Sequence, residues 1–217
     1  MMFRDRGDAA LRLADALGRW RGKHPLILAI PRGAVPMGKI IADALQGELD
    51  VALTRKLRAP DDSEFAVGSV AESGWADVAE YAGQVGADNE YLQQEIATQL
   101  STIRKRRAQY TGVAPPIDPT GRIVIVVDDG LATGATMLAA LHAVREKHPA
   151  YLICAAPVGS PDSIDKVSPY ADEVVCLYAP LNFGSVGRFY ANFMQVEDEE
   201  VIEILRGARS DGESGSA

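Results

Sequence analysis

The sequence predicts an α/β fold: an open, mostly parallel, twisted sheet with helices on both faces, plus a small hood subdomain. Short apolar runs rich in β-branched residues alternate along the chain with amphipathic segments of helical period. The runs carry few polar residues, which is typical of parallel strands buried on both faces. With 217 residues, the chain is long enough for one core and a modest subdomain.

The first half of the chain is expected to hold strands and helices in alternation. Apolar runs predict strands at 26–30, 49–54 and 65–70. Apolar residues at helical spacing predict helices at 8–21 and 35–45. The polar stretch 55–64 predicts a long loop between the second and third strands.

The second half continues this alternation after one long helix. Asp88 is a typical helix cap, and the helix that it begins should end near Tyr110. One apolar stripe runs along this helix, made of Leu92, Ile96, Leu100 and Ile103. Further strands are expected at 123–127, 151–157 and 173–178. Further helices are expected at 137–147, 163–167 and 199–206.

These elements are expected to form a single domain over residues 1–208. The core would comprise about 24–70 and 120–195, and 71–119 would form a helical hood over it. Residues 209–217 are small and polar, which predicts a disordered tail.

Composition and charge narrow the class of protein. Hydrophobic residues make up 47% of the chain and charged residues 24%, as in globular enzymes. No apolar run approaches the roughly 20 residues of a membrane span, and no secretory leader is visible, so we expect a cytoplasmic protein away from membranes. The net charge of −8 makes nucleic acid an unfavourable partner.

The most informative segment is 123–136, which reads IVIVVDDGLATGAT. A buried strand ends there in two adjacent carboxylates, Asp128 and Asp129, and ligands of open α/β sheets bind where such strands end. Backbone N–H groups and hydroxyls in the following turn can bind a phosphate beside a helix N-terminus. The residues of this turn are Ala132, Thr133, Gly134, Ala135 and Thr136. Because carboxylates accept hydrogen bonds from sugar hydroxyls, the segment predicts a site for a phosphorylated ribose.

This segment resembles the phosphoribosyl pyrophosphate (PRPP) motif of the type I phosphoribosyltransferases. The resemblance implies that family's fold, with Asp128 and Asp129 on the ribose hydroxyls and 132–136 on the 5′-phosphate. An ordinary strand-to-helix turn with an aspartate cap is the alternative interpretation. The stretches FRDRGDAALRLADAL, IPRGAVPMG, LTRKLRAP, AVGSVAE and NFGSVGRFYANFMQV extend the similarity to bacterial and archaeal phosphoribosyltransferases whose acceptor is unassigned.

Two further loops are candidates for the pyrophosphate of PRPP. Arg32 and Gly33 follow the first strand, where the family binds pyrophosphate, often beside a cis peptide that does not precede proline. Arg55 and Lys56 follow the second strand, where family members carry a mobile loop that closes over PRPP. Read without the resemblance, these segments are an ordinary turn and a solvated hairpin with surface cations.

An aromatic segment follows the last predicted strand. Phe183 and Phe189 are weak candidates to stack on a planar base, because stacking accepts any π-face. The alternative is that these rings fix the C-terminal segment to the core. The basic run 104–107 on the long helix is interpreted by default as a solvated face of that helix. Binding of an acidic acceptor is the less favoured interpretation.

The resemblance implies an enzyme that transfers the 5-phosphoribosyl group of PRPP to a nitrogenous base or related small acceptor and releases pyrophosphate. The catalytic set would be Asp128, Asp129, Arg32 and Lys56. Mg²⁺ would be held mainly by substrate oxygens, with Asp128 and Asp129 reaching it through water. PRPP and the acceptor are the expected partners, and the chain could form a homodimer. Two alternatives remain: a non-catalytic regulator that binds PRPP or a nucleotide, and a phosphohydrolase, for which no metal-ligand cluster is visible.

Overall fold

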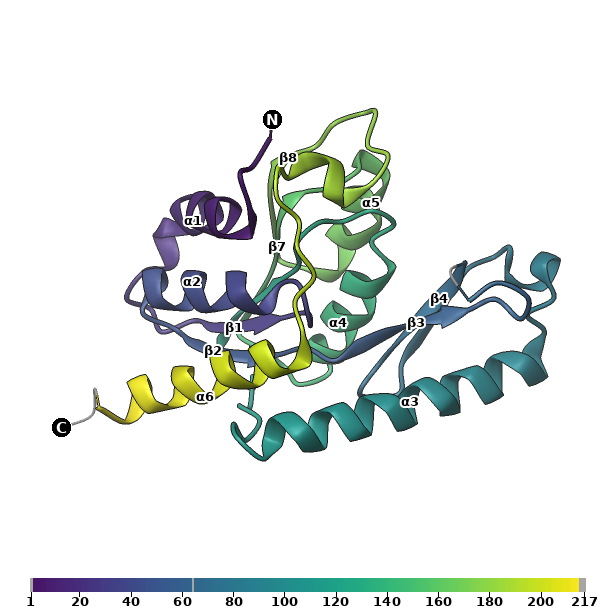
Figure 1. Cartoon of the computed structure of the whole chain (residues 1–217), viewed down its shortest axis with the longest axis horizontal. Helices are drawn as coiled ribbons and strands as arrows, with labels where there is room; N and C mark the ends of the chain where they lie inside the picture. The colour runs from purple at the N-terminus through teal and green to yellow at the C-terminus, as the bar shows by residue number, and fades with distance from the viewer. Residues whose placement is uncertain (1, 64, 215–217) are drawn as a thin grey trace.

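The computed structural model describes residues 2–63 and 65–214, arranged around a five-stranded parallel sheet in the order β2-β1-β6-β7-β8 (Figure 1). Its strands are β1 (Leu26–Ala29), β2 (Glu48–Val51), β6 (Ile123–Val127), β7 (Tyr151–Val158) and β8 (Glu173–Tyr178). A second, antiparallel sheet contains β3 (Thr54–Arg58), β4 (Ala66–Ala71) and β5 (Ala76–Val78). The α-helices are α1 (Arg6–Ala16), α2 (Val35–Leu45), α3 (Asn89–Thr111), α4 (Ala135–Arg145), α5 (Pro161–Val167) and α6 (Asp198–Ser214). Short 3₁₀ turns are η1 (Gly18–Trp20), η2 (Ala82–Val85), η3 (Ser168–Tyr170) and η4 (Val186–Phe189).

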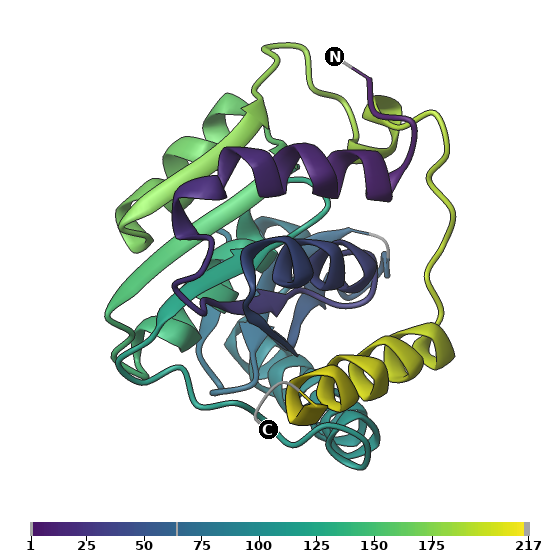
Figure 2. The ribbon, with the colours of Figure 1, turned by 90° about the vertical axis from the view of Figure 1, so that its left-hand side faces the viewer.

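Successive residues of the parallel strands face opposite layers of helices. Ile27 and Ile125 belong to the same core cluster as the buried residues of α1 and α2. Their neighbours Leu26 and Val124 pack in a second cluster with buried residues of α4. This alternation follows from the two-residue period of a strand, and it explains why the runs are apolar throughout. The predicted fold class is confirmed, and Figure 2 shows α1 and α2 in front of the sheet.

The predicted loop at 55–64 is wrong, because its first part is a strand. Strand β3 pairs antiparallel with β4, with Arg55 opposite Val70. Leu57 is fully buried between exposed neighbours, so the alternation of a strand is present, but charged side chains on the other face conceal it. The predicted third strand lies in this second sheet, and not in the core.

A lobe beside the core therefore begins at Thr54, earlier than the expected start of the hood at 71. Helix α3 lies along the hairpin of β3 and β4 (Figure 1). The predicted cap is confirmed, because the Asp88 carboxylate accepts a hydrogen bond from Tyr91 N at 2.9 Å. Of the predicted stripe, Ile103 is buried and the other three residues are partly buried against the core. We call residues 54–111 the lobe.

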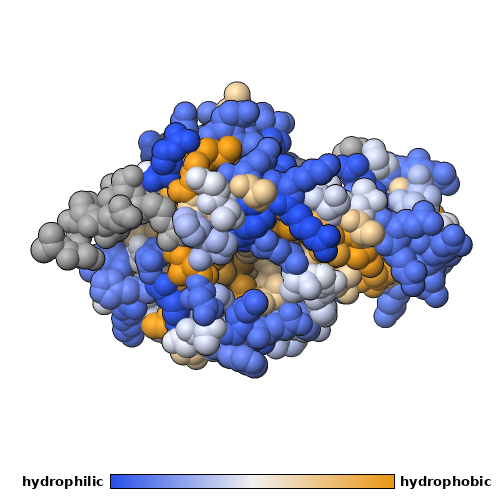
Figure 3. Space-filling view, turned by 90° about the horizontal axis from the view of Figure 1, so that it is seen from below, coloured by the Kyte–Doolittle hydropathy of each residue, from blue (hydrophilic) through white to orange (hydrophobic). Residues whose placement is uncertain are grey.

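The C-terminal helix is longer than predicted. Helix α6 continues to Ser214, so the disordered tail at 209–217 is wrong up to that residue, and 215–217 lie outside the described residues. Within residues 2–63 and 65–214, no helix is both long and apolar enough to cross a membrane. The face of the molecule seen from below is mainly hydrophilic, with scattered apolar areas (Figure 3).

Candidate functional site

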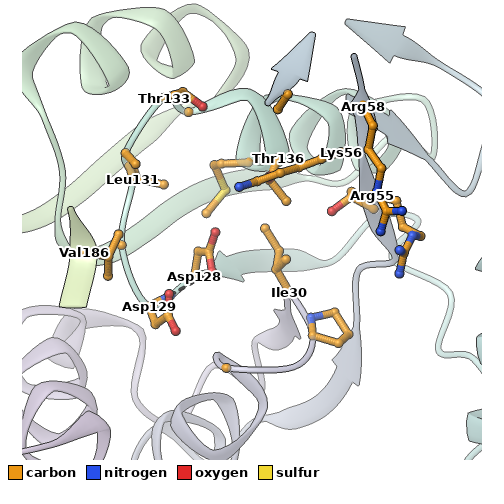
Figure 4. Close-up of a pocket in the computed structure, with 18 of the residues that line it drawn as sticks. Ile30, Arg55, Lys56, Arg58, Asp128, Asp129, Leu131, Thr133, Thr136 and Val186 are labelled. Carbon is orange, nitrogen blue, oxygen red and sulfur yellow. Dashed lines mark hydrogen bonds between the residues drawn. The ribbon is translucent and has the colours of Figure 1, made fainter. Parts of the chain in front are cut away.

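A cavity of about 520 Å³ lies where β1 and β6 end, between the core and the lobe (Figure 4). A cavity of this size can enclose a phosphorylated sugar. The loop after β1 contributes Ile30, Pro31 and Gly33. The core further contributes Val186, Met137 and the segment from Asp128 to Gly134 together with Thr136. The lobe contributes Thr54, Arg55, Lys56, Arg58, Ser63, Ala66 and Arg106.

The turn that begins α4 lines one side of this cavity. Gly134 is the N-cap, with φ of 71° and no side-chain capping bond. A side chain there would be strained, and its Cβ would lie 3.1 Å from the carbonyl oxygen of Ser163. Thr133 and Thr136 also line the cavity, whereas Ala135 is fixed through its carbonyl oxygen, which accepts a 2.7 Å bond from Ser69 Oγ. The N–H groups at this helix N-terminus and the hydroxyls of Thr133 and Thr136 suit an anion, as predicted for the phosphate, although the Ala135 N–H here donates to Thr133 Oγ1 at 3.5 Å.

Asp128 points into the cavity, below this turn (Figure 4). Its Oδ1 accepts a hydrogen bond from the backbone N–H of Asp129 at 2.9 Å. Burial raises the pKa of Asp128 well above its usual range, and the charge of Asp129 raises it further. The positive charges of Arg6 and Lys56 act to lower this pKa. The cavity therefore holds a carboxylate that lacks the solvation it would have in water.

Asp129 faces away from the turn and is held by an arginine that sequence reasoning missed. Arg6 Nε and Nη2 donate to Asp129 Oδ2 at 3.0 and 2.8 Å. The side chains are 13% and 17% exposed, so water screens this ion pair little. Burial raises the pKa of Asp129, and the hydrogen bonds and charge of Arg6 act against that rise. The backbone carbonyl of Asp129 accepts a 2.6 Å bond from the Tyr190 hydroxyl.

Cations from the lobe line the side of the cavity opposite the core. Lys56 extends from β3 toward Thr136 and the space above Asp128 (Figure 4). Arg55 donates to Gln99 Oε1 at 2.6 Å, and burial, followed by the charges of Arg106 and Arg58, lowers its pKa. Both residues lie on strand β3, so the segment expected to be a loop is a paired β-hairpin in this structure, and its closure over PRPP stays a prediction. A concentration of like charges of this kind favours an anionic ligand.

The guanidinium of Arg32 is not part of the cavity lining. The Pro31–Arg32 peptide is cis, as the resemblance led us to expect. Pro31 and Gly33 line the cavity, but Arg32 Nη1 donates to Glu197 Oε2 at 2.9 Å and lies 3.7 Å from Asp198 Oδ2. In this structure the Arg32 guanidinium is therefore engaged outside the cavity lining, and its contact with pyrophosphate stays a prediction. Two carboxylates at the start of α6 hold the guanidinium, and sequence spacing could not reveal this long-range pairing.

Phe183 and Phe189 are buried and do not line the cavity, so the structure does not support their predicted stacking on a base. Their ring centroids are 5.1 Å apart, and Phe189 also packs edge-on against Tyr178. They fix the C-terminal segment to the core, which was the alternative interpretation. Val186 lines the cavity instead, and it approaches Gly130 so closely that a Cβ on that glycine would lie 2.6 Å from Val186 Cγ1.

Comparison with known proteins decides the family. The family model of the phosphoribosyl transferase domain matches residues 7–193. The chain belongs to the phosphoribosyltransferase family. The resemblance drawn from the PRPP motif is therefore confirmed.

Individual relatives agree with this family assignment. Two Mycobacterium tuberculosis proteins, provisionally named phosphoribosyl transferases, are each 38% identical over 97% of this chain. The chain spans about half the length of these relatives, 48% of each. The crystal structure of TT1426 from Thermus thermophilus is 43% identical, with a TM-score of 0.80 over 95% of this chain and 99% of that one.

Two further arginines of the chain have contacts that the sequence did not indicate. Arg106 lines the cavity and binds Asp198 at 3.3 Å. Arg107 is largely buried, with Nη2 at 2.7 Å from Glu72 and Nη1 at 3.6 Å from Asp50. The solvated face expected for the run 104–107 is therefore wrong for these two residues. Their position within a basic run is the only local signal, and it does not distinguish them from exposed neighbours.

The carboxylates of the cavity fit a magnesium ion only as minor ligands. Within residues 2–63 and 65–214, no cluster of three or more His, Cys, Asp or Glu side chains is arranged to hold a metal. Asp128 faces the cavity and could meet a hydrated ion through water, whereas Asp129 is engaged by Arg6. Mg²⁺ retains several waters readily and binds substrate phosphates, so this arrangement is compatible with the ion arriving on its substrate.

Proposed function

We propose that this protein transfers the 5-phosphoribosyl group of PRPP to a nitrogen atom of a base or related small acceptor, and releases pyrophosphate. One observation supports this most: a single cavity contains the anion-binding turn of α4, the carboxylate of Asp128 and the ammonium of Lys56. These groups are complementary to a phosphate, a sugar hydroxyl and a pyrophosphate. PRPP contains all three in that order.

The proposed reaction needs electrostatic stabilisation more than a covalent nucleophile. The bond from C1 of the ribose to pyrophosphate breaks, and a bond from C1 to the acceptor nitrogen forms. Positive charge develops on the ribose ring and negative charge on the leaving group. Asp128 would stabilise the ring, and Lys56 would stabilise the pyrophosphate. Bound Mg²⁺ would supply further positive charge at the phosphate oxygens.

PRPP should bind in the presence of Mg²⁺ with a dissociation constant below about 1 mM, the usual range for enzyme substrates. Isothermal titration measures this binding directly. Ribose 5-phosphate should also bind, because it keeps the groups that face the α4 turn and Asp128. Ribose without phosphate is the control, and it should bind at least about tenfold more weakly because it lacks the charge that the helix N-terminus attracts.

Turnover separates the proposed enzyme from a PRPP-binding regulator. Pyrophosphate release should appear when PRPP is incubated with at least one member of a panel of nitrogenous bases. Saturable PRPP binding without release from any base would favour the regulator. Absence of binding by both PRPP and ribose 5-phosphate at millimolar concentration would overturn the proposal. Magnesium dependence, a cytoplasmic location and a homodimer stay predictions.

A further inference from the structure

Arg6 links the N-terminus of the chain to the carboxylate pair of the cavity. It is the first residue of α1, far from Asp129 in sequence, yet both bonds from Nε and Nη2 end on Asp129 Oδ2. This arrangement leaves Asp129 Oδ1 outside the contact with Arg6. A carboxylate held by one oxygen can still accept a hydrogen bond at the other.

The guanidinium of Arg6 is itself fixed on its remaining sides. Its Nη1 donates to the backbone carbonyl of Met194 at 2.5 Å. Its Cζ lies 3.9 Å from the centroid of the Phe193 ring, within cation–π distance. Phe193 in turn packs on Tyr190, whose hydroxyl donates to the backbone of Asp129. The plane of the guanidinium, and with it the orientation of the Asp129 carboxylate, is therefore strongly constrained.

Gly33 leaves room for this pair. A Cβ at Gly33 would lie 2.3 Å from Asp129 Oδ2 and 3.0 Å from Arg6 Nη2. Real Cβ atoms do not approach other atoms this closely, so any side chain at position 33 would displace the ion pair. Gly33, in the loop after β1, therefore both lines the cavity and lies against the Arg6–Asp129 ion pair.

We propose that Arg6 is a positioning residue that aims Asp129 Oδ1 at a hydroxyl of the bound ribose, and so makes the site prefer ribose over deoxyribose. This inference rests on the proposed function, because the ribose is the sugar of PRPP. Arg6 acts through Asp129 and is not among the residues that line the cavity.

The charges around Asp129 explain why such a residue is needed. Asp128 is the adjacent carboxylate, and Lys56 approaches it from the lobe. Tyr190 meets the Asp129 backbone from the C-terminal segment, and Arg6 is the cation bonded to the Asp129 side chain. Without Arg6, two partly buried carboxylates would repel each other, and Asp129 would be free to rotate away from the sugar.

The test compares ribose 5-phosphate with its 2-deoxy and 3-deoxy analogues by isothermal titration. Wild type should bind at least one analogue about ten to a hundredfold more weakly than ribose 5-phosphate, because a hydrogen bond to a carboxylate is lost. Arg6→Gln should reduce the larger of these two ratios to below about threefold, chiefly by weakening ribose 5-phosphate. Arg6→Lys should recover only part of the ratio, because an ammonium lacks the planar fork.

Two further variants separate positioning from a general effect on the fold. Arg12→Gln is a matched control on the same helix, because Arg12 pairs with Asp8 at 2.9 Å and lies 43% exposed. Its ratio should equal that of wild type. Gly33→Ala keeps both charges but displaces them, so its ratio should fall as in Arg6→Gln. If Arg6→Gln does not fold, Gly33→Ala tests the same positioning role.

The possible failures are distinguishable. If wild type does not bind ribose 5-phosphate, the proposed function fails. If wild type binds and discriminates, and both Arg6→Gln and Gly33→Ala keep the full ratio, the role of Arg6 is wrong while the proposed function stands. A loss of binding for all three ligands by the same factor in these variants would also contradict the positioning role.

Discussion

Asp128→Asn should lose most PRPP turnover and, in the same variant, raise the melting temperature. The substitution removes the charge that faces the sugar, so we expect kcat to fall about a hundredfold to a thousandfold. The shape of the side chain is preserved, and the amide oxygen can still accept the bond that the Asp129 N–H donates to Asp128 Oδ1 in wild type. Pyrophosphate release measures the first effect, and thermal unfolding without ligand measures the second.

The gain in stability follows from the raised pKa of Asp128. Burial and the charge of Asp129 raise it in the folded state, so the unfolded chain ionises more readily. The ionised carboxylate therefore destabilises the fold at neutral pH, and the penalty disappears as pH falls through the raised pKa. We expect Asp128→Asn to melt at least about 2 °C above wild type near neutral pH. The difference should shrink as pH falls toward the ordinary range of aspartate.

Asp50 provides a matched control, because it is a buried aspartate with a cation beside it. Its Oδ1 lies 3.6 Å from Arg107 Nη1, and its Oδ2 accepts a 2.8 Å bond from Ile117 N. Asp50→Asn should lower the melting temperature, because it removes a negative charge from beside a buried guanidinium. If Asp128→Asn also melted lower, or kept PRPP turnover, Asp128 would be a structural cap and not a ligand-facing carboxylate.

The parallel sheet and the phosphate turn could be predicted because their signals are local. A run such as 123–127 is buried on both faces, so each position carries the same preference for apolar residues. The turn after it needs small residues and hydroxyls at consecutive positions, with a left-handed Gly134 as the N-cap of α4. Both patterns can be recognised without knowing what packs against them.

The errors have a common physical origin in contacts between distant parts of the chain. Strand β3 is charged on one side because Lys56 and Arg58 face a cavity and not a hydrophobic layer, so its sequence is typical of a loop. Arg6 lies 123 positions from Asp129, and Arg32 lies 165 positions from Glu197. An arginine carries the same side chain whether it binds a ligand or another residue. Only the fold decides between these roles.

Lys56 and Arg32 are both cations that follow a predicted strand, but only Lys56 lines the cavity. Lys56→Met should lower kcat for PRPP about a hundredfold, because Lys56 lines the cavity and the charge it would stabilise grows as pyrophosphate leaves. Arg32→Met should cost less than about tenfold in kcat, because its guanidinium is held by Glu197. Initial rates with a productive acceptor, or slow PRPP hydrolysis in its absence, measure both variants. The opposite ranking would mean that Arg32 leaves Glu197 and enters the cavity when PRPP binds, and that the pyrophosphate is held from the β1 loop and not from the lobe.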